Sequence, residues 1–132
     1  MEIFFQDPGE IPLPPDEVRI RELKTEPWPD GRRVGVYLEV DPFQIRPNFD
    51  LVVTDARGQE RGTVSIIESM TRKMELTMHI QGSETDGEYT LSAALFFVER
   101  SQEEDPEALS QEPHIVDRAE RKFSIGIEQE NK

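Results

Sequence analysis

The sequence contains no cysteine among its 132 residues. A chain without thiols has no disulfide framework, no thiolate nucleophile and no cysteine-based zinc site, which removes several functions common in small domains. No stretch approaches the roughly 18 apolar residues that a membrane-spanning helix needs. The amino end also lacks the basic flank and sustained apolar run of a secretory signal. We therefore expect a cytoplasmic protein.

Basic residues are scarce as well: 15 Lys and Arg stand against 28 Asp and Glu, for a net charge of −13. Because binding to phosphates needs a cationic field, we expect neither nucleic acid nor a membrane as a partner. The length fits a single domain with room for a core. Hydrophobic residues make up only 35% of the chain, so we expect a folded domain with polar segments attached.

Apolar and polar residues alternate in short runs that are separated by turn-forming residues. In the clearest run, Val34, Val36, Leu38 and Val40 point to one face of an expected strand. The seven runs lie at 18–21, 34–40, 49–53, 64–66, 74–80, 89–97 and 123–127. No ten-residue stretch has a convincing helical period. The pattern predicts an all-β, seven-stranded antiparallel sandwich closed by a Greek key.

Composition divides the chain around this sandwich. Residues 1–15 contain four prolines and are expected to form an extended arm. The sandwich is expected over 16–128, with a mobile acidic loop at 99–113 that has too few apolar residues to offset the entropy of ordering it. Residues 129–132 are expected to be a disordered tail.

The segment 86–91, Asp-Gly-Glu-Tyr-Thr-Leu, resembles the tyrosine corner of immunoglobulin-like and fibronectin-type sandwiches. In that family a tyrosine near the start of the sixth strand binds the backbone upstream of it through its hydroxyl group. The resemblance covers residues 16–128 and implies that Tyr89 is a structural corner. Leu91 stands where antibody domains have their second cysteine, so the resemblance is to cysteine-free members of the bacterial or fibronectin kind.

Catalytic chemistry has few candidate residues in this sequence. The only possible histidine bases are His79 and His114, and no nucleophile is marked near either. The many carboxylates leave a glycosidase pair or a calcium site open as alternatives, but no Asp-x-Asp-x-Asp ladder occurs. We expect no catalytic residue, no cofactor and no metal site, and therefore no enzyme.

The loop at 41–47 is the more informative segment, because large apolar residues lie there between prolines in a stretch expected to face water. Phe43, Ile45 and Arg46 combine apolar and cationic character, which is typical of protein interfaces. The alternative is that Phe43 and Ile45 only plug the end of the sandwich. We take the three residues as a partner-binding hypothesis.

The run at 89–97 turns apolar on both faces near its end, where Phe96 and Val98 are expected to point outward. Residues Ile3, Phe4 and Phe5 of the arm are available to cover them, either within one chain or exchanged between two copies of a homodimer. Coverage by Leu109 or Ile115 is the alternative.

These observations favour a non-enzymatic module for protein–protein interaction or scaffolding. Two other classes stay open. One is a carbohydrate- or calcium-binding domain that uses Trp28, Tyr37 or loop acids, and the other is a small hydrolase or an accessory enzyme subunit. The sequence does not name the partner.

Overall fold

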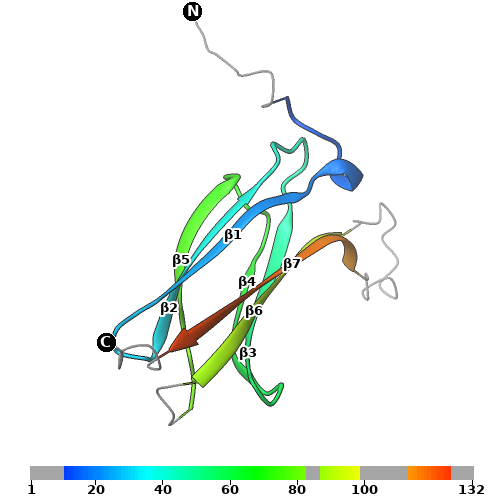
Figure 1. Ribbon diagram of the computed structural model, residues 1–132. Coiled ribbons are helices and arrows are strands. Elements are labelled where there is room, and N and C mark those ends of the chain that lie inside the picture. The colour runs from blue at the N-terminus through cyan, green and yellow to red at the C-terminus, as the bar shows by residue number, and fades with distance from the viewer. Residues whose placement is uncertain (1–10, 83–86, 99–112, 126–132) are drawn as a thin grey trace, which may run out of the picture.

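The computed structural model describes residues 11–82, 87–98 and 113–125 (Figure 1). These residues form seven antiparallel strands and one short 3-10 helix, η2 (Pro15–Glu17). The strands are β1 (Ile20–Pro27), β2 (Arg33–Val40), β3 (Asn48–Asp55), β4 (Glu60–Ile66), β5 (Lys73–His79), β6 (Gly87–Val98) and β7 (Pro113–Ile125). The predicted all-β, seven-stranded antiparallel sandwich is confirmed. The described residues contain no helix long and apolar enough to cross a membrane.

The strands pack as two layers, a three-stranded sheet in the order β1-β2-β5 and a four-stranded sheet in the order β4-β3-β6-β7 (Figure 1). The chain therefore crosses between the sheets after β2, β4 and β5. The start of β1 and the β2–β3, β4–β5 and β6–β7 connections lie at one end of the sandwich, which we call the arm end. The β1–β2, β3–β4 and β5–β6 connections lie at the opposite end.

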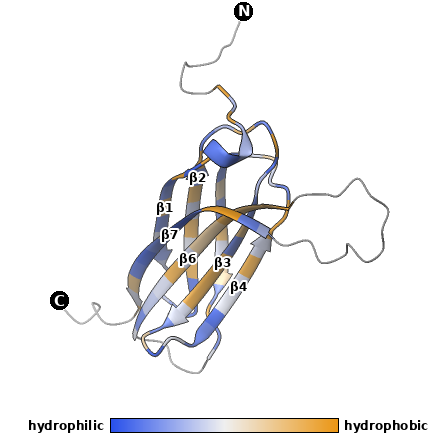
Figure 2. Ribbon diagram, turned by 90° about the vertical axis from the view of Figure 1, so that its right-hand side faces the viewer, coloured by the Kyte–Doolittle hydropathy of each residue, from blue (hydrophilic) through white to orange (hydrophobic). Residues whose placement is uncertain are grey.

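The core fills the space between the two sheets and follows the period of two that the sequence predicts. Along β2 every second side chain is buried, and the neighbouring side chains reach the outer face. Hydrophobic and hydrophilic residues accordingly alternate along the strands (Figure 2). The fully buried large side chains include Leu23, Leu38, Phe49, Leu51, Met78, Leu91, Leu95 and Ile125.

Two of the four edge strands, β1 and β7, are longer than their apolar runs. β1 continues to Pro27, six residues beyond the predicted run at 18–21, and β7 begins at Pro113, ten residues before Phe123. The backbone of an edge strand is held by one neighbour, and its side chains are mostly exposed here, so the apolar alternation that marks a strand is missing. The last run continues to Ile127, which lies outside the described residues.

The described part of the arm is bound to the loop between β2 and β3. Leu13 N donates to Pro42 O at 3.0 Å, and Gln44 N donates to Leu13 O at 2.9 Å, so Leu13 and Phe43 form a short parallel bridge. The expected contact residues Ile3, Phe4 and Phe5 lie outside the described residues, and their covering role stays a prediction.

Candidate functional site

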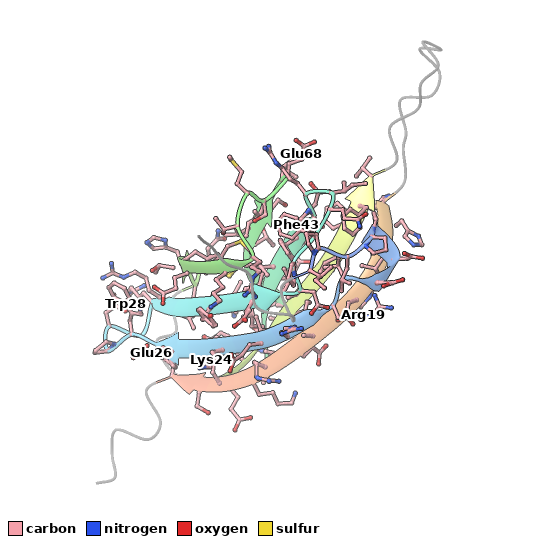
Figure 3. All side chains as sticks on the ribbon, turned by 90° about the horizontal axis from the view of Figure 1, so that it is seen from above. Arg19, Lys24, Glu26, Trp28, Phe43 and Glu68 are labelled. Carbon is pink, nitrogen blue, oxygen red and sulfur yellow. The ribbon has the colours of Figure 1, made fainter. Side chains whose placement is uncertain are left out.

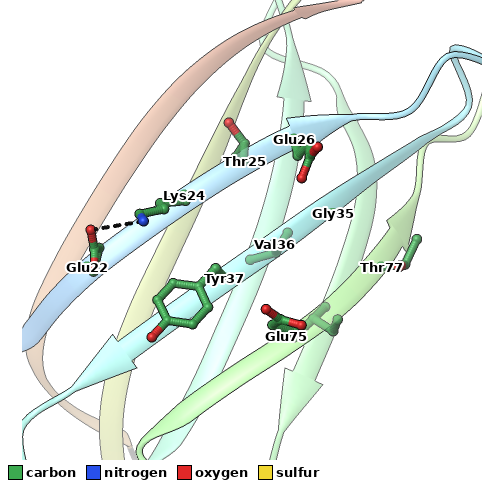
Figure 4. A pocket seen from close by; sticks show the side chains of 10 residues that line it. Glu22, Lys24, Thr25, Glu26, Gly35, Val36, Tyr37, Glu75 and Thr77 are labelled. Carbon is green, nitrogen blue, oxygen red and sulfur yellow. Dashed lines mark ion pairs between the residues drawn. The ribbon is translucent and has the colours of Figure 1, made fainter.

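A shallow groove of about 690 Å³ crosses the outer face of the β1-β2-β5 sheet (Figure 4). The groove results from the pairing of the strands, because side chains at paired positions of adjacent strands project from the same face of the sheet. All three strands contribute to it. The side chains that give the groove its chemistry are Glu22, Lys24 and Glu26 from β1, Tyr37 from β2, and Glu75 and Thr77 from β5.

Tyr37 lies at the centre of the first row of side chains, paired with Lys24 on one side and Glu75 on the other. Its hydroxyl donates to Glu39 Oε1 at 3.0 Å. Lys24 Nζ lies 5.5 Å from the centre of the Tyr37 ring and 3.4 Å from Glu22 Oε2. Desolvation of the phenol, its hydrogen bond to Glu39 and the nearby carboxylates raise the pKa of Tyr37. The phenol is therefore a neutral donor at physiological pH.

Gly35 occupies the centre of the next row, between Glu26 and Thr77. A Cβ atom at this position would lie 3.6 Å from Glu26 O and 3.7 Å from Trp28 Nε1, both of which are ordinary contact distances. The groove is open here because Gly35 has no side chain, not because the backbone needs glycine. Trp28 borders the hollow through its indole nitrogen.

Trp28 is held in place by its neighbours in the turn between β1 and β2. The Arg33 guanidinium lies 4.1 Å from the centre of the indole ring, and Arg33 Nη2 is 2.7 Å from Asp30 Oδ2. A hydrogen bond from the Arg32 backbone amide, together with Arg33, lowers the pKa of Asp30, so this carboxylate stays charged. Among the described residues Trp28 Nε1 has no hydrogen-bond acceptor, which leaves its N–H available at the groove.

The groove is rich in hydrogen-bond acceptors and carries a negative charge. Three carboxylates, Glu22, Glu26 and Glu75, line it against the single ammonium group of Lys24. Ionised carboxylates only accept hydrogen bonds. The groove is therefore suited to a ligand that offers hydroxyl or amino donors, and it repels anions.

The structure separates the three residues of the partner-binding hypothesis. Phe43 is half-buried and packs against the core, so for this residue the alternative interpretation as a plug agrees with the structure. Ile45, with 55% of its surface exposed, and Arg46 both face solvent. The loop thus offers an exposed pair beside a packed anchor.

Phe96 and Val98, which were expected to point outward from β6, differ in their exposure to solvent. Val98 is exposed, whereas Phe96 is covered and keeps only 8% of its surface. The pairing of β6 with β7 shifts between Leu95 and Phe96 and places Phe96 opposite Ile115. Asn48 Nδ2 also donates to Phe96 O at 3.2 Å, so the backbone here is enclosed by β3 as well.

Tyr89 is buried, and its ring stacks on Phe123 with the ring centres 5.6 Å apart. The backbone immediately upstream, at 83–86, lies outside the described residues, so the bond proposed for the tyrosine corner stays a prediction. His79 and His114 are both exposed and lie at opposite ends of the sandwich. Within the described residues no three His, Asp or Glu side chains come together in a way that could hold a metal ion.

Sequence reasoning named Trp28 and Tyr37 but missed the groove that joins them. The signal available was Gly35, a glycine in the middle of the strongest strand pattern of the chain, where a side chain is expected. Glu22 and Glu75 gave no signal, because a carboxylate beside a groove looks in sequence like any solvated carboxylate.

No protein-family model matches this sequence, and no curated protein does. Solved structures similar in fold include a β-glucuronidase from Bifidobacterium dentium complexed with coumarin-3-O-glucuronide, which is 16% identical with a TM-score of 0.53. The match covers 82% of this chain and 18% of that one. A glycosyl hydrolase family 2 member from Bacteroides cellulosilyticus is 10% identical, with a TM-score of 0.52 and coverage of 82% and 14%. The chain therefore spans less than a fifth of each enzyme, and the likeness shows a shared fold.

Proposed function

We propose that this chain is a non-catalytic β-sandwich module that binds a neutral carbohydrate in the groove on the β1-β2-β5 sheet. The observation that carries the proposal is the hollow at Gly35, open to solvent between Tyr37 and the indole N–H of Trp28. An aromatic side chain offers an apolar face for the C–H groups of a sugar ring, and the surrounding carboxylates accept hydrogen bonds from its hydroxyls.

The charge of the groove narrows the ligand class. An acidic sugar would meet three carboxylates and only one ammonium group, so a neutral or amino sugar fits better than a uronate. Fold likeness to parts of two carbohydrate-acting enzymes supports this ligand class over calcium. The arrangement into three- and four-stranded sheets supports the resemblance to fibronectin-type domains, which we propose as the fold relatives.

We assign the three carboxyl groups of the groove to binding rather than to catalysis. Glu22, Glu26 and Glu75 line an open groove on the outer face of the sheet, and Glu22 Oε2 lies 3.4 Å from Lys24 Nζ. We therefore assign these side chains to hydrogen bonding with the ligand. This role is compatible with the alternative of an accessory enzyme subunit, since a binding module can serve a catalytic domain on the same chain or on another chain.

The test is calorimetric titration with neutral oligosaccharides, namely cellohexaose, xylohexaose and mannohexaose, with glucuronic acid as the acidic comparison. With oligosaccharide concentrations up to about 10 mM, a Kd of about 1 mM is readily measured. We expect one neutral oligosaccharide to bind and Gly35→Val, which fills the hollow, to weaken that binding at least about tenfold, a change of ~1.4 kcal/mol.

Two controls make the result specific. Gly35→Val should not lower the melting temperature, because β-branched residues are favoured in strands and the added Cβ atom would meet nothing closer than 3.6 Å. Ile67→Ala, which shortens an exposed apolar side chain at the arm end, should leave sugar binding unchanged. Failure of every neutral sugar to bind, or equal binding by Gly35→Val, would refute the proposed function.

A further inference from the structure

Three residues follow one another along the outer face of β2: Gly35, Tyr37 and Glu39. The first two line the sugar groove, whereas Glu39 is not among its lining residues. Figure 4 shows the Tyr37 ring lying along β2, with its hydroxyl group directed toward the end of the strand where Glu39 follows. The only hydrogen bond that holds this hydroxyl group in the described residues is the one to Glu39 Oε1, at 3.0 Å. The orientation of Tyr37 therefore depends on a residue outside the groove.

Glu39 in turn has a cationic partner. Arg72 Nη1 lies 3.3 Å from Glu39 Oε2, which is the oxygen that Tyr37 does not use. The side chains of Arg72 and Glu39 keep only 21% and 18% of their surface exposed. Salt screens a partly buried ion pair much less than an exposed one. One oxygen of the carboxylate is thus held by Arg72 and the other by Tyr37, which fixes the direction in which the carboxylate points.

Arg72 reaches Glu39 from the loop between β4 and β5, at the position just before β5 begins. Its backbone is fixed there, because Val40 N donates to Arg72 O at 2.9 Å. Figure 3 shows Glu68 of the same loop far from Trp28, which borders the other end of the groove. Arg72 is therefore a residue of the arm end that acts on the outer face of the sheet from outside the groove.

The bond to Glu39 also determines what Tyr37 offers to a ligand. A phenol has one O–H group and two lone pairs, whereas a carboxylate only accepts hydrogen bonds. The bond between the two side chains therefore uses the single proton of Tyr37. The phenol oxygen then has only lone pairs for a ligand, as do the Glu26 and Glu75 carboxylates of the groove. A ligand must supply the hydrogens, which the hydroxyl groups of a sugar do.

We propose that Arg72 is a positioning residue of the sugar groove, which holds the Glu39 carboxylate so that the Tyr37 hydroxyl accepts a hydrogen bond from a sugar hydroxyl. This inference rests on the proposed function, because it concerns how the same groove recognises its ligand. Arg72 itself does not touch the sugar. Without its guanidinium, the Glu39 carboxylate loses the contact at Oε2 and can turn away from the phenol.

A double-mutant cycle on sugar affinity tests this role. Cellohexaose, xylohexaose and mannohexaose are titrated calorimetrically into the full chain and into Arg72→Leu, Tyr37→Phe and the double variant. For the sugar that binds, Arg72→Leu should raise the Kd roughly two- to tenfold, which is the net worth of one hydrogen bond. Because Arg72 acts through Tyr37, adding Arg72→Leu to Tyr37→Phe should raise the Kd no further.

Two matched variants separate positioning from a general effect of charge. Arg72→Lys keeps a cation beside Glu39 and should bind the sugar more tightly than Arg72→Leu. Lys73→Leu removes the same charge from the next residue, which is exposed and pairs with Glu39 across β2 and β5, and it should leave the Kd unchanged. Thermal melts of all variants confirm that they fold.

The outcomes distinguish this inference from the proposed function. If Arg72→Leu leaves the Kd unchanged, or raises it equally with and without Tyr37, the positioning role is overturned while the groove remains a sugar site. An equal effect of Lys73→Leu would also overturn the role, in favour of a general effect of charge. If the native chain binds none of the three sugars, the proposed function fails and this inference fails with it.

Discussion

Replacing Gly62 with alanine should open the edge of the sandwich where the two sheets approach each other. Gly62 is buried in β4, and a Cβ atom there would lie 2.6 Å from the backbone oxygen of His79 in β5. Ordinary contact begins at 3.4 Å, so the methyl group is about 0.8 Å too close. The obstacle is backbone rather than a flexible side chain. β4 is paired with β3, and β5 is paired with β2, so relief requires two sheet edges to move apart.

Overpacking of this kind costs about 1 to 3 kcal/mol. For a chain of this size each kcal/mol shifts the melting temperature by roughly 4 °C, so Gly62→Ala should melt about 4 to 12 °C below the native chain. Thermal and urea unfolding followed by circular dichroism measure the change. Gly35→Ala is the matched control, because its methyl group would meet nothing closer than 3.6 Å and the substitution reduces the entropy of the unfolded chain. If Gly62→Ala melts no lower than Gly35→Ala, the close approach of β4 and β5 is refuted.

Three further predictions concern single features of the fold. Tyr89→Phe keeps the buried ring but removes the hydroxyl, so it should lower the free energy of unfolding by about 0.5 to 1.5 kcal/mol, and an unchanged urea midpoint would contradict the tyrosine corner. In that variant Tyr37 is the only tyrosine, so spectrophotometric titration measures its phenol alone. The pKa of Tyr37 should lie above the usual value of about 10, and the additional substitution Glu39→Gln should make this rise smaller. Because the folded state has the raised pKa, its contribution to stability is complete below the unfolded pKa and is lost as the pH rises through the folded pKa. Deleting residues 1–15 removes the hydrogen bonds of Leu13 and should lower the melting temperature. The mass of the protein in solution shows whether the arm is exchanged between two copies. If neither the melting temperature nor the mass changes, the arm is a free tail.

The arm-end surface shows where local pattern stops being informative. The loop at 41–47 was singled out because apolar residues occur where polar ones are expected, and the sequence left open whether they bind or plug. Phe43 packs and Ile45 does not, a difference set by the bridge from Leu13, about thirty residues earlier in the chain. The loop between β4 and β5 gave no signal of its own, since its contact with the loop at 41–47 depends on a hydrogen bond from Ser69 N to Pro47 O.

The sequence by itself determined the class of fold and the inner face of each central strand. That is because the alternation of Val34, Val36, Leu38 and Val40 is a local property: each second side chain of an extended backbone must point the same way. The lengths of the edge strands β1 and β7 were underestimated, since few of their side chains are buried and their sequences carry no such period.

Only the tertiary structure decided the groove. Lys24, Tyr37 and Glu75 become one row because β2 pairs with β1 on one side and β5 on the other, in registers that no short stretch of sequence specifies. A shift of one residue in either pairing would turn the side chains of one strand to the opposite face, so the three residues would no longer lie side by side. Register is fixed by the summed burial of the core, so the polar residues that line the groove are placed by the apolar residues behind them.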